Sequence, residues 1–581
     1  MFLLPSGKWG KEFINETTRL LNCWVEDSPM KDIAFKVIMI MPSLLLQKPN
    51  KESKVKDHVI ALERRFALWK NGELIELMNE CRAIQERLPN QDTKKSIGTL
   101  SKQFAKRMQK GNVNGALKLL TENMQNGILP INEETLRLLK LKHPKPSPAQ
   151  EKVLLADIPK KIHPVVFENL TADTIRKAMV KTTGGSGPSG IDSDGWKRML
   201  LGNSFGQSST DLCNSIALVA RKLSTVENLN STLEALLACR LIPLNKYPGL
   251  RPIGVGEILR RVIGKAIISI NKDVIAKSVG SLQVCAGQEA GCEAAVHAMR
   301  EIFNENDTQA VLLVDAANAF NSVNRNVFLH NIKVICPEIA TFVMNCYSSS
   351  SRLFVIGGVE ISSSEGTTQG DPIAMAVYAT AIIPLILMVL EVTEEIPGPA
   401  TKSEAYADDI AAGGSLKNLL IWWKDLCKLG PLFGYYPEES KSWLIVKPTL
   451  EKAAHEAFKD TKINITTNGK KHLGAVVGTE SYRDEYVSLK IEKLCEELRI
   501  LIEIAKLEPQ AAYSAFVSGF RHKLTYMMRT IPNIGHILSK IDDIINQEFI
   551  PAVTGGKVVN ENERKLLSLP VRYGGLALPI C

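Results

Sequence analysis

Three aspartates follow or interrupt short apolar segments in a pattern that suggests a shared cation site. Asp408 and Asp409 stand side by side in EAYADDIAAG (404–413), with apolar and small residues around them. Asp315 ends the apolar run AVLLVD (310–315). Adjacent carboxylates repel each other and cost stability in a strand-like context unless a cation binds them. The pattern predicts that 404–413 forms a tight hairpin with acid at its turn.

If the strand before Asp315 and this hairpin are neighbours in one sheet, Asp315 and Asp408 converge. Oxygen ligands of this kind suit hard divalent cations, so we expect Mg²⁺, with Mn²⁺ as the alternative ion. Two such ions about 4 Å apart stabilise both the attacking and the leaving oxygen of an in-line phosphoryl transfer. An Asp at a strand end can also be a turn former or a helix cap. Two acid-ended segments and a doublet make that simpler interpretation weaker.

The surrounding segments predict a mixed α/β region between two helical ones. Residues 1–140 have mostly helical periodicity, and KHPKPSPAQ (142–150) has the composition of a linker. Strand-like runs and Gly-rich turns occupy roughly the next third of the chain, and the pattern is helical again over 482–550. The turn-rich stretch GGSGPSGIDSDGW (184–196) is expected to be a mobile or substrate-facing loop.

Length and composition bound the class of protein. The chain has 581 residues, of which 45% are hydrophobic and 23% charged, so it should fold into several subdomains. Its net charge of +9 tolerates a polyanionic partner without requiring one. The 11 cysteines show neither disulfide nor zinc spacing, and no apolar run is expected to reach membrane-spanning length. We expect an intracellular protein of the cytoplasm or nucleus with no membrane partner.

Six motifs resemble, in order, those of reverse transcriptases. YADD (406–409) resembles their Tyr-x-Asp-Asp box, and LLVDAANAFNSVNR (312–325) resembles the first catalytic motif, in which an aromatic residue lies five positions after the Asp. EGTTQGDPIAMAVYA (365–379) resembles the Gln-Gly motif that contacts template and nucleotide. The set is most similar to enzymes of non-long-terminal-repeat retrotransposons. The other three motifs are LIPLNKYPGLRPIGVGEILRRVIGKAI (241–267), FGYYPEESKSWLIV (433–446) and HLGAVVG (472–478).

The resemblance implies an α+β right-hand polymerase with fingers, a palm of antiparallel sheet and helices, and a helical thumb. It also implies where these parts begin and end. The expected domains are a helical N-terminal region of unassigned role at 1–150, a fingers-like region at 151–265, a reverse transcriptase palm with the remaining fingers elements at 266–480, and a helical thumb-like region with the C-terminal tail at 481–581.

The resemblance assigns metal and triphosphate ligands. Asp315 and Asp408 would be the principal metal ligands and Asp409 a secondary one, and without metal the cluster should have raised pKa values because three carboxylates repel. Lys246 and Arg251 would hold the nucleotide triphosphate, where fixed positive charge favours the departing pyrophosphate. A solvated basic loop is the alternative for these two residues.

Other roles follow from the same motifs. Phe320 would lie under the sugar and exclude a 2′-hydroxyl, with core packing as the alternative. Gln369 and Gly370 would lie along the template and the nucleotide, since glycine permits close backbone approach. Lys441 would donate a proton to pyrophosphate, or would simply be a surface lysine. For the basic residues of the C-terminal helices, the alternative is the solvated face of an amphipathic helix. The residues assigned to primer or template contact are Tyr406, Leu473, Gly474, Arg521 and Lys523.

These assignments predict an RNA-directed DNA polymerase of a retrotransposon-like element. It would extend a DNA or RNA primer with dNTPs on an RNA template by two-metal-ion nucleotidyl transfer. No ribonuclease H, zinc knuckle or endonuclease motif is recognised, so a separate endonuclease or another element-encoded protein would cleave DNA. One alternative is an RNA-dependent RNA polymerase, against which Phe320 and Ala407 argue, because such enzymes typically carry Asp and Gly there. The other is a catalytically inactive RNA-binding protein derived from a retroelement polymerase, against which the intact aspartates argue.

Overall fold

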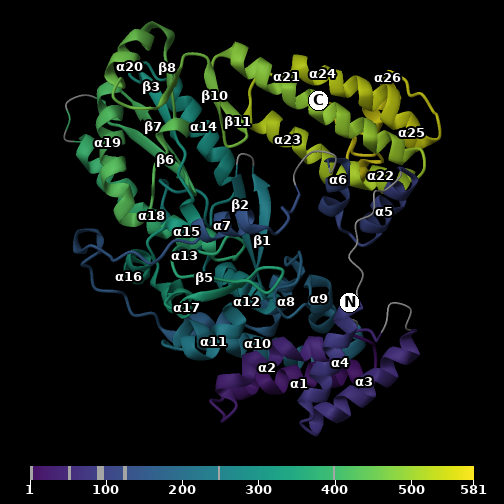
Figure 1. Cartoon of the computed structure of the whole chain (residues 1–581). Helices are drawn as coiled ribbons and strands as arrows, with labels where there is room; N and C mark the ends of the chain where they lie inside the picture. The colour runs from purple at the N-terminus through teal and green to yellow at the C-terminus, as the bar shows by residue number, and fades with distance from the viewer. Residues whose placement is uncertain are drawn as a thin grey trace.

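The computed structural model has a mixed α+β fold that is 62% helical and contains several small sheets (Figure 1). The α+β class expected from the sequence is therefore confirmed. The structure describes residues 4–49, 54–87, 97–121, 127–246, 249–394, 396 and 399–580.

A five-stranded sheet with the order β6-β7-β3-β8-β9 carries the aspartates. Neighbouring strands are antiparallel except β8 and β9, which are parallel. All five residues of β3 are buried, which explains its unbroken apolar sequence, because a central strand covered on both faces needs no polar side. The strands are β3 (Ala310–Val314), β6 (Lys402–Tyr406), β7 (Asp409–Gly414), β8 (Trp443–Val446) and β9 (Asn464–Thr466).

Small residues in β7 allow a helix to approach the sheet closely. Helix α14 (Gly291–Asn304) packs on β6, β7 and β3. A Cβ atom at Gly413 would lie 2.2 Å from Cγ2 of Ile302 on this helix, so any larger residue there would push the helix away. The other helices near this sheet are α18 (Ala374–Glu394), α19 (Leu416–Phe433) and α20 (Glu451–Ala457).

Helix α18 contradicts one expectation. It has 21 residues and is apolar enough, by length and composition alone, to cross a membrane, so the expectation that no run reaches that length is wrong. However, 67% of its most apolar window is buried inside the molecule. That burial is typical of a core helix, since a lipid-facing helix would expose its apolar side chains.

A second, four-stranded sheet has the order β2-β1-β4-β5. Strands β1 and β2 form an antiparallel hairpin in which Lys246 pairs with Gly249, and β1 also pairs with β4 in parallel. Its strands are β1 (Cys239–Lys246), β2 (Gly249–Gly256), β4 (Ser351–Phe354) and β5 (Glu360–Ser363).

The glycine-rich loop at 184–190 is tied to the start of helix α12 (Ile258–Ile270). The buried carboxylate of Glu257 accepts hydrogen bonds from the backbone N–H of Ser189 at 2.6 Å and from its hydroxyl at 2.7 Å. Arg261 donates to the backbone carbonyls of Thr183 and Gly185. These bonds anchor the first part of the segment expected to be a mobile or substrate-facing loop, and that expectation stays a prediction.

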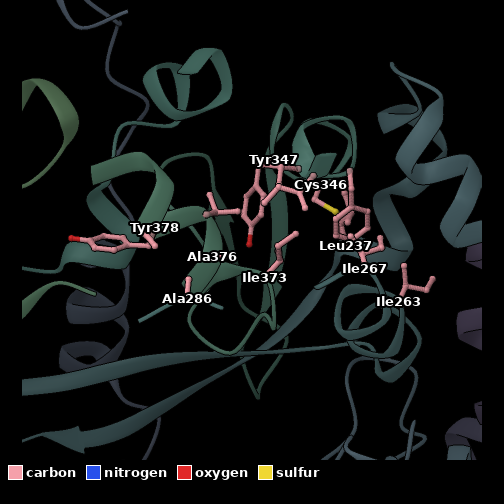
Figure 2. Close-up of a cluster of buried hydrophobic side chains, with 14 of the residues drawn as sticks. Leu237, Ile263, Ile267, Ala286, Cys346, Tyr347, Ile373, Ala376 and Tyr378 are labelled. Atoms are coloured by element: carbon pink, nitrogen blue, oxygen red, sulfur yellow. The ribbon is translucent and has the colours of Figure 1, made fainter. Parts of the chain in front are cut away.

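Buried side chains join the helices beneath the two sheets. Figure 2 shows part of this core, in which α11, α12, α17 and α18 meet. The aromatic and sulfur-containing side chains of Tyr347, Cys346 and Tyr378 lie among smaller aliphatic ones. The helices that complete this region are α8 (Ala172–Val180), α9 (Ser193–Leu201), α10 (Gln207–Thr225), α11 (Asn230–Leu237), α13 (Lys272–Val279), α15 (Ala319–Ser322), α16 (Arg325–Ile335) and α17 (Pro337–Tyr347).

The described helices among the first 150 residues pack in three separate places (Figure 1). Helices α1 and α2 pack on α10 and α11, and α3 and α4 pack against them. Helices α5 and α6 pack on the C-terminal helices, and α7 packs on β2. These helices are α1 (Lys8–Val25), α2 (Lys31–Leu45), α3 (Val55–Lys70), α4 (Leu74–Glu86), α5 (Ile97–Gln109), α6 (Val113–Thr121) and α7 (Glu133–Leu141).

The C-terminal region is helical, as the periodicity predicted, and its helices share a second core with α5 and α6. Phe516 lies between Phe520 and Phe549, with ring centroids 5.5 and 4.7 Å apart. A short hairpin, β10 (Gly469–His472) and β11 (Ala475–Gly478), precedes these helices. They are α21 (Glu480–Ala505), α22 (Pro509–Ala515), the π-helix Phe516–Phe520, α23 (Arg521–Thr530), α24 (Gly535–Ile544), the π-helix Ile545–Phe549, α25 (Ile550–Thr554) and α26 (Glu561–Ser568).

Candidate active site

Strand pairing places the three aspartates at one end of two neighbouring strands of the five-stranded sheet. β3 and β7 are antiparallel neighbours, and Val314 pairs with Ile410. Asp315 directly follows Val314, and Asp409 directly precedes Ile410. The pairing that the sequence hypothesis required is therefore present.

The turn between β6 and β7 has a strained backbone that the buried Gln283 side chain holds by hydrogen bonds. Ala407 has a φ of 58°, a left-handed conformation that residues with a side chain seldom adopt. The side chain of Gln283, which is 0% exposed, accepts a hydrogen bond from Ala407 N–H at 2.7 Å and donates to its carbonyl at 3.0 Å. The Tyr435 hydroxyl also donates to the Asp408 carbonyl at 3.1 Å. The hairpin that presents the two aspartates is thus fixed by residues outside it.

Burial and mutual repulsion act on these carboxylates. Burial raises the pKa of Asp408, and Asp315 raises it further, while Lys246 and Arg251 oppose the shift. Asp409 is exposed to solvent, but neighbouring protein atoms still remove part of its hydration. This desolvation, followed by repulsion from Asp408 and Asp315, raises the pKa of Asp409 to about 6. Such a cluster favours the binding of a cation, which would offset the repulsion.

The donor chemistry fits a hard divalent cation. Carboxylate oxygens from two adjacent strand ends are suitable ligands, and Asp315 and Asp408 would hold the ion with Asp409 beside them. Across the residues that the structure describes, however, no group of three or more His, Cys, Asp or Glu side chains is gathered to hold a metal ion. The three aspartates are close enough to interact electrostatically but are not assembled as a set of three ligands.

A cavity of about 710 Å³ opens beside the aspartates. Asp315 and Asp409 line it, together with apolar residues of both sheets. Its wall is rich in positive charge from four separate parts of the chain, which would attract a phosphate-bearing ligand. The lysines that line it are Lys142, Lys246, Lys441, Lys470 and Lys471.

The residues predicted to hold the triphosphate lie on the β1–β2 hairpin. Lys246 ends β1 and lines the cavity, and Arg251 on β2 pairs with Leu244. Both side chains are exposed, and both act on the pKa of Asp408. Lys441 lines the same cavity and forms an ion pair with Glu438 at 2.7 Å.

The loop that carries Gln369 and Gly370 lies on the same hairpin but does not line the cavity. The Gln369 carbonyl accepts a hydrogen bond from Gly254 N–H at 2.8 Å. Gly370 has a φ of 112°, and a Cβ atom there would lie 2.6 Å from the Gly254 carbonyl oxygen, so only glycine fits. Beside it, the buried Asp371 accepts hydrogen bonds from Arg260 at 2.5 Å and from Tyr347 at 2.7 Å, and these fix the loop.

Phe320 is half-buried and stacks on Tyr378, with ring centroids 4.6 Å apart. The packing interpretation of this ring is therefore confirmed, and its contact with a sugar stays a prediction. Tyr378 is fully buried, and within the described structure its hydroxyl has no hydrogen-bond partner.

The predicted primer and template residues divide into two groups. Leu473 lines the cavity, and its carbonyl accepts a hydrogen bond from Tyr526 at 2.6 Å. The neighbouring Gly474 carbonyl accepts from Tyr486 and Lys490, each at 2.9 Å, and Tyr406 lies half-buried at the end of β6. By contrast, Arg521 donates to the Ala577 carbonyl and Lys523 pairs with Glu497. Neither of these last two basic residues lines the cavity.

Sequence reasoning missed several residues of this site. Lys142 lies in a proline-rich stretch whose composition indicated only a linker, and Gln283 is a single amide in the otherwise apolar segment SLQVCAG. Lys470 was missed although it lies next to a predicted motif, and its ammonium sits 3.4 Å from the ring centroid of Trp443. A basic pair before HLG was the one local signal that could have indicated this wall of the cavity.

Comparison with known proteins finds no family model and no curated protein that matches this chain. The function must therefore be inferred from its own residues.

Proposed function

We propose that this protein is an RNA-directed DNA polymerase of a retrotransposon-like element that extends a DNA or RNA primer with dNTPs on an RNA template. The pairing of β3 with β7 carries the proposal, because it brings Asp315 to the turn that holds Asp408 and Asp409. The lysine-lined cavity beside them supports the same function, since a triphosphate needs positive charge next to the metal-binding carboxylates.

In this proposal the elements take the parts of a right-hand polymerase. The five-stranded sheet with α14, α18 and α19 is the palm. The four-stranded sheet and the helices packed around it are the fingers, and the helices from α21 onward are the thumb. The ordered motifs support this assignment, because each falls on an element that borders the cavity or supports its walls.

The chain's own residues would divide the work as follows. Asp315 and Asp408 would hold divalent cations, which when bound neutralise the triphosphate and favour the attack of the primer hydroxyl. Lys246 and Arg251 bind the phosphates and orient them. Lys441, which lines the same cavity, would give a proton to the leaving pyrophosphate oxygen. Phe320 excludes a 2′-hydroxyl by occupying the space that it would need.

A catalytically inactive, polymerase-derived RNA-binding protein is the second candidate. It is favoured by one observation, that the described aspartates are not gathered as three ligands of one ion. A protein of this kind would still bind RNA through its basic cavity wall, but it would extend no primer.

Primer extension by the full-length protein tests the proposal. We expect Mg²⁺-dependent incorporation of dNTPs, and little of rNTPs, on a primed RNA template. Asp408→Asn keeps the shape of the side chain but removes its charge, so it should lower the rate by at least about 100-fold, as loss of a main transition-state interaction does. Asp307→Asn is the matched control, since Asp307 is exposed before the other end of β3.

Three results would contradict the proposal. The first is RNA binding by the wild type without any extension, which would support the inactive protein. The second is preferential incorporation of rNTPs, which would support an RNA polymerase. The third is extension that Asp408→Asn leaves unchanged, because the activity would then come from another site or a contaminant.

A further inference from the structure

Helix α7, in the N-terminal region, ends beside the cavity and positions Lys142 in its lining. Leu138 and Lys142 both line the cavity. They are four residues apart, so they lie on the same face of the helix end, whereas Lys140 between them is exposed on another face. On the helix's other contact surface, Leu139 is fully buried against Leu241 and Leu250 of the β1–β2 hairpin.

The backbone around Lys142 is anchored on several elements of the site. Before α7, Leu129 N–H donates to the Pro243 carbonyl of β1 at 2.9 Å. At Lys142 itself, the Asn318 amide donates to the carbonyl at 3.0 Å, and Asn318 belongs to the loop that follows Asp315. After it, Ser147 N–H donates to the buried Glu365 carboxylate at 2.6 Å. These bonds fix the position from which the Lys142 side chain extends.

Lys142 lies near other ammonium groups and has little negative charge beside it. Burial lowers the pKa of Lys142, and the nearby Lys441 and Lys246 lower it further, against a small opposing effect of Glu438. Glu438 is already paired with Lys441. Among the described residues, Lys142 and Lys246 take part in no ion pair within 4.0 Å. Lys246 also interacts with Asp408 and Asp409, so Lys142 is the least compensated of the three, and a bound polyanion would remove the repulsion that it experiences.

We propose that Lys142 is a phosphate-binding residue of this cavity, which together with Lys246 and Lys441 contacts the polyphosphate of a nucleoside triphosphate or the pyrophosphate released from it. The identity of the nucleotide rests on the proposed function; the binding of polyphosphate does not. The cavity volume of about 710 Å³ falls within the range of small-molecule pockets. A small polyphosphate therefore fits the cluster better than a nucleic-acid backbone, which would track along a longer groove.

By this proposal, residues 127–155 belong to the polyphosphate-binding site. Lys142, at the end of α7, adds positive charge to the cavity near Lys246 and Lys441. It would stabilise the triphosphate in the bound state and in the transition state alike. Its loss should therefore raise the KM for nucleotide more than it lowers kcat.

The test measures binding of inorganic pyrophosphate with Mg²⁺ to the full-length protein by titration calorimetry. Lys142→Ala should weaken binding roughly tenfold, as expected for loss of a charge-assisted contact, and Lys142→Arg should retain most of it. Lys140→Ala, on the exposed face of the same helix, is the matched control and should bind as the wild type does. Circular dichroism checks that each variant is folded.

The results of this test separate the role of Lys142 from the proposed function. Pyrophosphate binding that is unchanged in Lys142→Ala but weakened in Lys246→Ala overturns the proposal, and so does a wild type that binds none at millimolar concentration. Weaker binding of an RNA–DNA duplex with unchanged pyrophosphate binding also overturns it, in favour of a nucleic-acid contact. If Lys142→Ala weakens pyrophosphate binding and the wild type extends no primer, the polyphosphate site stands and the proposed function fails. If Lys142→Ala extends primers with an unchanged KM for dNTP, the role of Lys142 is refuted and the proposed function stands.

Discussion

Glu404 is a buried carboxyl group that no described residue stabilises. Its side chain lies on β6, is 7% exposed, and has no hydrogen-bond partner for either oxygen within the described chain. Burial raises its pKa from 4.5 to about 7. The folded protein therefore holds a proton that the unfolded chain releases between these two values. Stability must fall as pH rises through this window and then stay at the lower level.

Glu404→Gln should remove this pH dependence. We expect the variant to be more stable than the wild type by about 2 kcal/mol at pH 8, because an amide is never ionised, with the difference shrinking as pH falls toward 5. Urea unfolding at both pH values measures it. The exposed Glu301 on α14 gives the control variant Glu301→Gln, which should show no such pH-dependent difference. A gain in stability that is the same at pH 5 and pH 8 would mean that Glu404 is not the titrating group.

At the scale of elements, the β6–β7 hairpin depends on a segment outside the sheet. Gln283 is paired with Ala405 through a parallel bridge, in which Val284 N–H donates to the Ala405 carbonyl at 2.9 Å. Its side chain then satisfies both backbone groups of Ala407, the residue in the left-handed conformation. Without these two bonds, buried N–H and C=O groups would lose their partners at Ala407, where the chain turns between Tyr406 and Asp408.

We expect Gln283→Ala to destabilise the protein and the hairpin together. Leaving two buried backbone groups unpaired should cost about 2–4 kcal/mol in the free energy of unfolding. Hydrogen exchange of β6 and β7 amides should rise more than that of β8. Gln288→Ala is the control, because the Gln288 amide donates only to the Gly280 carbonyl on the exposed surface. If Gln283→Ala changes stability by no more than this control, the hydrogen bonds of Gln283 are not needed for the turn.

Local sequence pattern predicted the strands of the site but not their supports. The apolar run of β3 and the small-residue hairpin β6–β7 were predictable, because burial on both faces and a tight turn impose their own residue types. The contact between Gln283 and Ala407 was not, since it joins residues 124 positions apart and leaves no local periodicity. Likewise, the prolines after Lys142 indicate that no helix continues there, but they do not indicate where the chain packs. At 184–190 composition predicted a mobile or substrate-facing loop but gave no sign of its hydrogen bonds to Glu257 and Arg261.

At the scale of the whole molecule, the N-terminal region reaches the C-terminal helices. Phe104 of α5 is fully buried in the core that includes Ala512 and Phe516, and Leu117 of α6 lies in the same core. A Cβ atom at Gly519 would lie 2.5 Å from Cδ1 of Leu117, so the glycine permits this close packing. The pair α5–α6 lies beside the C-terminal helices in Figure 1, far from α1–α4. Residues about 400 positions apart in sequence therefore form one unit.

This shared core predicts that a change in α5 loosens the C-terminal helices selectively. Phe104→Ala should leave a cavity that costs about 3–5 kcal/mol in that unit, and amide exchange should rise in α22 and the π-helix that follows it. Phe66→Ala is a matched control, because Phe66 is equally buried but packs on Trp9 in the N-terminal helices, so exchange should rise in α1 and α3 instead. Faster exchange in α5 alone after Phe104→Ala, with α22 unchanged, would show that the C-terminal helices keep their structure without the N-terminal pair. Faster exchange in both α5 and α22 would show that the two segments unfold together. The reason is that the Phe104 ring, which joins their packing, has been removed.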